Sequence, residues 1–205
     1  EELPARDLVE NCKKYAELDE RNPYFTYYLG RAYERNGESD LALRTCSLAA
    51  QMAPLWGEPL LLAAQILSAR GNVPAATVLA QQALFRSPQD VYLAAAAAEI
   101  PGVDIELLSD AERGQLWDLV EKIQSIRPME PRTLPLLIEF LARRGHAPLA
   151  EKKLGAVLAG EEGLPEPTVL RLAQISRNFD LGQTDACYAY ASRSFGSTPN
   201  LALEQ

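Results

Sequence analysis

Few residues in this chain of 205 residues have a type and spacing suited to chemistry. The one histidine, His146, directly follows Gly145. A zinc site would need further Cys, His, Asp or Glu ligands at regular spacing, and none accompanies this histidine. A histidine general base would need a pocket, and the sequence around Gly145 indicates a turn between two packed helices. We therefore expect no metal site, no cofactor and no catalytic residue.

Carboxylates gather in two polar segments, where acid–base catalysis would need a pair enclosed in a pocket. Glu161, Glu162 and Glu166 lie in a stretch rich in glycine and proline. Asp180 and Asp185 stand on either side of a second turn sequence. Solvated surface charge accounts for both groups. The sequence therefore predicts a protein that is not an enzyme.

The overall charge and hydropathy limit the classes of partner. The net charge is −8, 47% of residues are hydrophobic and the mean hydropathy is −0.15. Nucleic acids and anionic membranes attract basic surfaces, so neither is expected as a partner. No apolar run reaches 18 residues, and we expect no membrane insertion. The sequence begins at Glu1 without a methionine, which we expect of a piece of a longer protein.

The three cysteines, Cys12, Cys46 and Cys187, are an odd number and form no CxxC pair. This pattern does not indicate a disulfide framework, and we expect three reduced thiols buried as small apolar side chains. The compartment stays open between the cytoplasm, which unpaired thiols favour, and the periplasm.

The sequence repeats with a period of 34 residues. Small residues, a turn glycine and a terminal proline recur in register: Gly37, Ala42, Ala49 and Pro54 are followed by Gly71, Ala76, Ala83 and Pro88. The same step takes Cys46 back to Cys12, so the first helical segment has the position of the second helix of a truncated unit. Small residues at this period predict close helix crossings, and the glycines and prolines predict where helices end.

The pattern of these residues resembles that of the tetratricopeptide repeat family. Leu29-Gly30, Tyr33, Ala42 and Pro54 match its pattern, while Thr26 replaces the usual tryptophan and Cys46 the usual phenylalanine. A further match runs through Leu137, Leu141, Gly145, Ala150 and Leu154. The resemblance implies an all-α fold, a right-handed α-solenoid of stacked antiparallel helix hairpins.

The expected organisation is a single repeat domain over residues 1–205. It comprises a lone helix at 5–20 and hairpins at 23–54, 57–88, 89–128, 131–160 and 165–199. The third unit departs from the period through an insertion of six residues around 101–108. Such an insertion either decorates one face of the solenoid or is a tolerated surface loop.

In this family the first helix of each hairpin lines a concave groove that binds peptides or partner helices. The resemblance therefore assigns the groove-facing positions to Tyr24, Tyr27, Arg31 and Glu34 in the first full unit, and to Glu58, Leu61, Gln65 and Ser68 in the next. It assigns Tyr92, Ala95 and Glu99 to the third unit, and Arg132, Glu139 and Ala142 to the fourth. Two tyrosines beside an arginine would form a binding hot spot. The alternative is that Tyr24 or Tyr27 packs against the upstream helix.

The resulting expectation is a non-catalytic scaffold that binds a protein or peptide in the concave groove, with self-association through the end repeats as a further expectation. The lysine and asparagine clamp with which some relatives hold a C-terminal carboxylate is absent, because Tyr27, Tyr28 and Arg31 occupy that stretch. The alternative function is a structural spacer in a larger secretion, polysaccharide-export or glycosyltransferase protein, whose activity lies in another domain.

Overall fold

The computed structural model describes residues 4–127, 130–160 and 163–196, and its regular secondary structure in these ranges is entirely helical. Contacts divide the chain into two compact units, Glu1–Arg113 and Gly114–Gln205. The all-α fold of stacked helix hairpins predicted from the sequence is confirmed. The expectation of a single continuous domain stays a prediction, and its third hairpin, 89–128, spans the boundary between the units.

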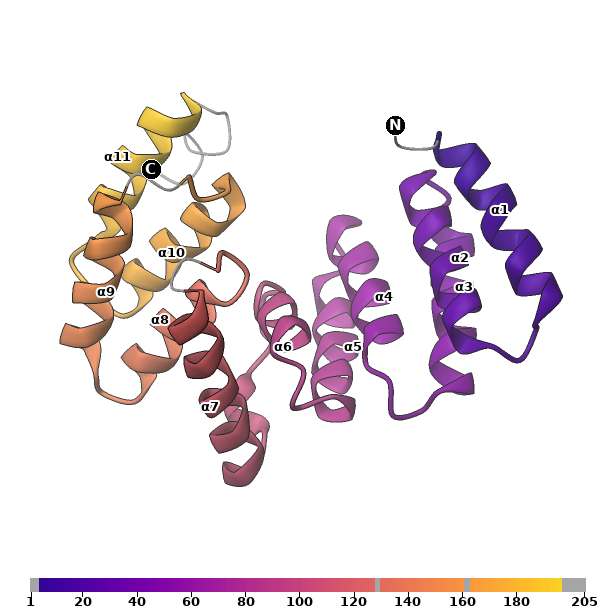
Figure 1. Cartoon of the computed structure of the whole chain (residues 1–205), viewed down its shortest axis with the longest axis horizontal. Helices are drawn as coiled ribbons and strands as arrows, with labels where there is room; N and C mark the ends of the chain where they lie inside the picture. The colour runs from indigo at the N-terminus through magenta and orange to yellow at the C-terminus, as the bar shows by residue number, and fades with distance from the viewer. Residues whose placement is uncertain (1–3, 128–129, 161–162, 197–205) are drawn as a thin grey trace. The chain divides into compact units, whose positions relative to one another are not determined.

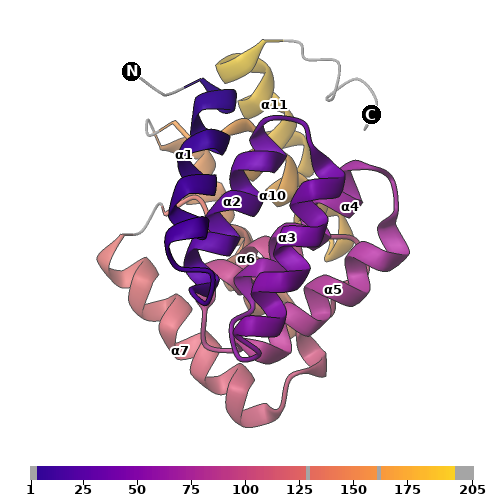
Figure 2. The same ribbon diagram turned by 90° about the vertical axis from the view of Figure 1, so that its right-hand side faces the viewer.

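Unit 1 consists of consecutive helices that pack as antiparallel neighbours. They are α1 (Ala5–Leu18), α2 (Pro23–Arg35), α3 (Ser39–Met52), α4 (Glu58–Ala69), α5 (Val73–Arg86), α6 (Val91–Ala98) and the short 3₁₀ helix η1 (Ile105–Leu107). Helix α2 pairs with α3 and α4 with α5, while α1 packs on α2 and α3 on α4. Figures 1 and 2 show each pair side by side.

Side-chain caps and left-handed glycines mark the helix ends. The Asn22 side chain accepts a hydrogen bond from the backbone N–H of Tyr24 (3.0 Å), and Asp90 accepts two in the same way at the start of α6. The turns within the first two hairpins use Gly37 and Gly71, both at φ +78°, a backbone conformation that side chains with a Cβ disfavour. The glycine period in the sequence therefore marks the hairpin turns.

Small residues lie where the helices cross. Ala42 and Ala76 are fully buried, one in each of the first two hairpins. Gly30 in α2 rests on α3, and a Cβ at this position would lie 3.1 Å from the Cys46 Sγ atom. Close backbone approach lets both hairpins pack at high density with few large side chains.

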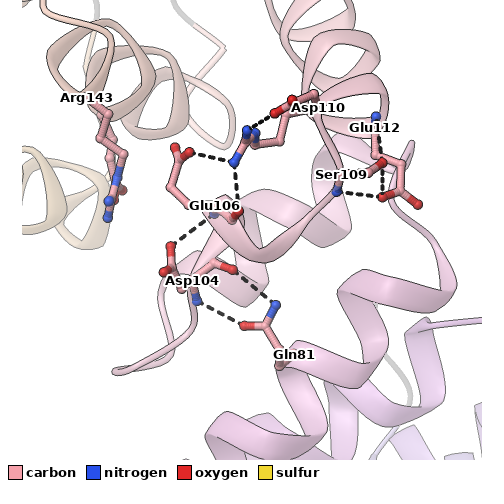
Figure 3. A network of polar contacts seen from close by, with 9 residues as sticks. Gln81, Asp104, Glu106, Ser109, Asp110, Glu112 and Arg143 are labelled. Atoms are coloured by element: carbon pink, nitrogen blue, oxygen red, sulfur yellow. Dashed lines mark hydrogen bonds and ion pairs between the residues drawn. The ribbon is translucent and has the colours of Figure 1, made fainter.

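The insertion folds back onto α5, as Figure 3 shows. The Gln81 side chain donates to the Asp104 carbonyl oxygen (3.1 Å) and accepts from the Asp104 N–H (3.0 Å). The Thr77 hydroxyl donates to the carbonyl oxygen of Pro101 (2.6 Å). Within the insertion, the side chains of Ile105 and Leu108 are buried. The insertion is thus a packed element on the second helix of its neighbouring hairpin.

The start of α7 (Asp110–Ile126) continues from this segment. Ser109 and Glu112 cap each other, with the Ser109 hydroxyl donating to the Glu112 carboxylate (2.6 Å). Arg113 binds Glu106 (2.8 Å) and also pairs with Asp110.

Unit 2 contains most of α7 and two helix pairs. The pairs are α8 (Leu134–Arg143) with α9 (Ala147–Ala159), and α10 (Glu166–Asn178) with α11 (Thr184–Phe195). Trp117 of α7 stacks on Phe140 of α8, with ring centroids 4.5 Å apart. The Leu164 N–H donates to the Tyr190 hydroxyl (3.0 Å), which holds the connection before α10 against α11.

The observed helices differ in their ends from the predicted segments. The first helix ends at Leu18 rather than at residue 20, whereas α10 begins at Glu166, one residue after the start of the last predicted hairpin. Pro167 lies in the first turn of α10, where its fixed φ suits a helix start. Residues 128, 129, 161 and 162, and 197–199 at the end of the last hairpin, lie outside the described residues.

Candidate functional site

The candidate site lies on the first helices of the hairpins in unit 1: α2, α4 and α6 (Figure 1). In α2, the expected stripe of Tyr24, Tyr27, Arg31 and Glu34 follows helical steps of three and four residues. The side chains of this stripe differ in their exposure. Tyr24 is 57% exposed, whereas Tyr27 is 7% exposed, and Arg31 and Glu34 are both exposed.

Trp56 accounts for the division. This residue lies in the loop between α3 and α4, and its ring centroid is 4.6 Å from that of Tyr24 and 4.8 Å from that of Tyr27. Tyr24 covers the outer side of the tryptophan, and Tyr27 lies inside, in a core cluster with Ala63 and Ile66 of α4. Both tyrosines therefore contact the residue that leads into the downstream hairpin. Sequence reasoning missed Trp56, although a tryptophan within a short loop is itself a signal of a packed position.

The Tyr27 hydroxyl forms a hydrogen bond to the Glu58 carboxylate at the start of α4 (3.1 Å). Burial raises the pKa of the Tyr27 phenol, the negative charge of Glu58 raises it further, and nearby Arg31 opposes this shift. Glu58 is half-buried and lies on the expected face. The hydrogen bond between Tyr27 and Glu58 therefore joins α2 to α4. Tyr27 stabilises this face, and little of its side chain is accessible to a ligand.

Helices α4 and α6 continue the face. Leu61, an expected groove residue, is 4% exposed and belongs to the core, as does Ala95 at 7%. Gln65 is exposed and, with Ser68, faces Glu99 across a shallow pocket of about 330 Å³. Its lining comprises Gln65, Ser68 and Ala69 from α4 with Ala96, Glu99 and Ile100 from α6 and the residues directly after it. Tyr92 is 42% exposed at the start of α6, where the Asp90 cap fixes the first turn.

Of the eleven groove-facing positions expected in unit 1, eight therefore have exposed or half-exposed side chains. They are Tyr24, Arg31, Glu34, Glu58, Gln65, Ser68, Tyr92 and Glu99. Their exposure is consistent with a surface role, and that role stays a prediction. The other three, Tyr27, Leu61 and Ala95, are buried beneath this surface.

In unit 2, the corresponding position of α8 holds an ion-pair network. The Glu139 carboxylate binds Arg143 of its own helix and Arg171 of α10, both at 2.9 Å. The Glu139 side chain is only 12% exposed. Its two arginines neutralise it, and the network joins α8 to α10. Arg171 was not singled out from the sequence.

The structure describes most of the residues that were considered for chemistry. His146 is exposed at the start of α9, and the described part of the chain contains no group of three or more His, Cys, Asp or Glu side chains placed to hold a metal ion. Glu166 is in the first turn of α10, while Glu161 and Glu162 lie outside the described residues. No helix within the described ranges is long and apolar enough to cross a bilayer.

All three cysteines are free thiols. Cys46 and Cys187 are fully buried, and burial raises the pKa of each thiol to about 12. Cys12 is half-buried on α1, and burial raises its pKa as well. The structure thus leaves Cys12 as the most accessible thiol.

Solved structures of other proteins share this arrangement of helices. The chain superposes on PilW, described as a widely conserved type IV pilus biogenesis factor, with a TM-score of 0.55 at 16% identity, over 98% of this chain and 90% of that one. The fold is that of a tetratricopeptide-like helical repeat. A thermophilic TPR protein from Thermus thermophilus also matches, with a TM-score of 0.49 and 19% identity over 89% of this chain and 96% of that one.

At these identities the likeness concerns the TPR-like fold alone. No family model matches the sequence, and no curated protein matches it either.

Proposed function

We propose that the chain is a non-catalytic scaffold that binds a peptide or an extended segment of a partner protein across α2, α4 and α6 of unit 1. The observation that supports this proposal is the open row of aromatic and polar side chains on successive first helices. Tyr24 and Tyr92 on this row are 57% and 42% exposed.

The row has the composition of an interface. Tyrosine offers a large contact area with few rotatable bonds, and arginine binds carboxylates through two parallel hydrogen bonds. Tyr24 rests on Trp56, and Arg31 projects from the helix that buried Tyr27 anchors, so both side chains have a rigid support. The pocket between α4 and α6 provides room for one side chain of the partner, with Gln65 and Glu99 at its rim.

Glu34, Glu58 and Glu99 lie on the same row as Arg31. The row is therefore mixed in charge, and a ligand would need a carboxylate near Arg31 and a basic or hydrogen-bond-donating group near Glu99. We propose such a segment, of mixed charge with one aromatic or aliphatic anchor, as the ligand class. The similarity to PilW makes a protein of a pilus or export assembly a reasonable source of partners to screen.

The test uses a photoreactive amino acid placed at Gln65, and separately at Phe85 as a control. Phe85 is 49% exposed on α5, the second helix of the pair. Crosslinking in an extract should capture a partner from position 65 and not from position 85. The captured segment is then titrated as a purified peptide.

The affinity of that peptide for variants of the protein tests the assignment of the binding face. Tyr24→Ala and Arg31→Ala should each weaken binding about tenfold, which corresponds to about 1.4 kcal/mol. The matched controls, Phe85→Ala and Arg44→Ala on the second helices, should leave affinity unchanged. Equal effects in both sets, or a partner captured only from position 85, would refute the assignment of this face.

A further inference from the structure

The 34-residue period aligns side chains in rows across the candidate face of unit 1. It takes Arg31 of α2 to Gln65 of α4, and Gln65 to Glu99 directly after α6. All three side chains are exposed. Helix α4 contacts both α2 and α6 (Figure 1), so the three positions follow one another across the face, one in each hairpin. We call Arg31, Gln65 and Glu99 the charge row.

The charge of this row changes sign from α2 to α6. Arg31 is positive, Gln65 is neutral and Glu99 is negative at neutral pH. Helix α2 carries two arginines and one carboxylate, whereas the sequence from 87 to 112 contains six carboxylates and no lysine or arginine. The sign at each end therefore agrees with that of the surrounding segment. A ligand that crosses the face meets a cation at one end and an anion at the other.

Both ends of the charge row lie beside α4. The Tyr27 hydroxyl binds the Glu58 carboxylate of α4 (3.1 Å), and Arg31, one turn further along α2, opposes the rise in the Tyr27 pKa. Arg31 is therefore close to the side of α2 that faces α4, and it also borders a groove between α1 and α2. At the other end, Glu99 and Gln65 line the shallow pocket between α6 and α4.

A second row on the same face holds aromatic rings. Tyr24, Glu58 and Tyr92 are one period apart, and both tyrosines are exposed. The Tyr24 ring lies against Trp56, and the Asp90 cap fixes the first turn of α6, which carries Tyr92. Segments in the polyproline II conformation bind in grooves lined by aromatic side chains, because this conformation is already ordered before binding. The two tyrosines give the face this character.

The spacing of the hairpins matches the period of such a segment. Helices that pack together lie about 8–10 Å apart. A polyproline II segment rises about 3.1 Å per residue and completes one turn in about three residues, a length of about 9.3 Å. One turn of the ligand therefore spans one hairpin, and every third side chain points to the same side. Two such steps lead from α2 to α6, so about six ligand residues separate the ends of the charge row.

We propose that the face formed by α2, α4 and α6 selects a proline-rich segment of a partner protein in which an acidic and a basic residue are about six positions apart. This inference rests on the proposed function and names the ligand that the face would select. The acidic residue binds Arg31 and the basic residue binds Glu99, with an apolar residue between them beside Gln65. Ala69 and Ala96 line the pocket, so the aliphatic stem of the basic residue packs on small side chains while its charge reaches Glu99.

Two synthetic peptides of equal composition test the spacing. The matched peptide is Glu-Pro-Pro-Leu-Pro-Pro-Lys, and the control peptide is Glu-Pro-Pro-Lys-Pro-Pro-Leu, in which the charges are half as far apart. Both are acetylated and amidated so that their ends carry no charge, and binding is followed by amide NMR titration at low ionic strength. The protein should bind the matched peptide with a dissociation constant below about 1 mM. It should bind the control peptide about fivefold more weakly, as expected when one exposed ion pair is lost.

Removing single charges tests the order of the row. Arg31→Gln is combined with a peptide whose Glu is replaced by Gln, and Glu99→Gln with a peptide whose Lys is replaced by Gln. In these double-mutant cycles each matched pair should show a coupling of about threefold in affinity, and the two crossed pairs less than about twofold. Arg44→Gln on α3 and Glu17→Gln on α1 remove the same charges from exposed positions outside the face and should show no coupling. Circular dichroism checks that every variant keeps its helix content.

Three results would overturn the proposal: no binding of the matched peptide up to about 1 mM; equal affinities for the two peptides; or couplings in the crossed pairs as large as those in the matched pairs. Partner capture from Gln65 tests the proposed function separately. Capture together with any of these three results would leave the binding face in place and overturn the charge order. Matched couplings without capture would support the charge order and count against the proposed function.

Discussion

Replacing Tyr27 and Tyr24 in turn should separate the structural residue of the candidate face from the exposed one. Both lie on α2 and both contact Trp56, with ring centroids 4.8 and 4.6 Å from it. Tyr27 is 7% exposed and Tyr24 is 57% exposed. Tyr27→Ala removes a buried ring and should lower the free energy of unfolding of unit 1 by about 3–5 kcal/mol. Tyr24→Ala loses mainly one ring contact, about 0.5–1.5 kcal/mol.

Tyr27→Phe isolates the hydroxyl. The ring stays in place, and the change removes a single hydrogen bond to Glu58, which is half-buried and can be solvated. The expected loss is about 1 kcal/mol, the usual net value of such a bond. Tyr27→Phe should therefore resemble Tyr24→Ala in stability and differ clearly from Tyr27→Ala.

The assay is urea unfolding followed by tryptophan fluorescence in a Trp117→Phe background, so that Trp56 alone reports. Because Trp56 contacts both tyrosines, the signal follows unit 1. Circular dichroism at the same urea concentrations checks that helicity is lost in parallel. Equal losses for Tyr27→Ala and Tyr24→Ala would refute the division of this face into a buried and an exposed row.

Two further predictions concern packing and pH. Gly57→Ala should destabilise unit 1 by about 1–3 kcal/mol, because its Cβ would lie 2.5 Å from the Ala83 carbonyl oxygen. The control is Gly114→Ala, whose Cβ would have no atom within 4 Å and which should stabilise α7 by up to about 1 kcal/mol. Thermal melts compare the two variants, and a Gly57→Ala variant as stable as the parent protein would contradict the close approach. The pKa of the Cys46 thiol is about 12 in the folded chain against an ordinary 9.0, so its contribution to stability is complete below pH 9 and is lost as the pH rises towards 12. In urea melts from pH 8 to 10.5, the free energy of unfolding should therefore decline less for Cys46→Ala than for the parent protein. Identical declines in the two proteins would exclude this cause.

The arrangement of hairpins could be predicted because it follows from local rules repeated along the chain. Gly37 and Gly71 recur where a left-handed residue must end a helix, and both have φ +78°. Ala42 and Ala76 recur where backbones must approach, and both are fully buried. Each rule depends on a few neighbouring residues and on the period.

The division of the candidate face could not be predicted in the same way. Tyr24 and Tyr27 are three residues apart on one helix and project within about 60° of each other, so the helical period places both near the same side. Which ring is buried depends on Trp56, which reaches the pair from a loop about 30 residues further along the chain. The same holds for Leu61, whose burial depends on how close neighbouring helices lie.

The structure of the insertion could not be predicted from local sequence either. Its position, 101–108, followed from counting back along the period, and its structure depends on Thr77 and Gln81 of α5, which hold its backbone through hydrogen bonds. The sequence by itself determined that the chain forms helical hairpins, where they turn and which small residues they bury, because these features depend on period and backbone conformation. Only the tertiary structure decided which side chains of a helix remain open to a partner, because exposure depends on residues brought together from distant parts of the chain.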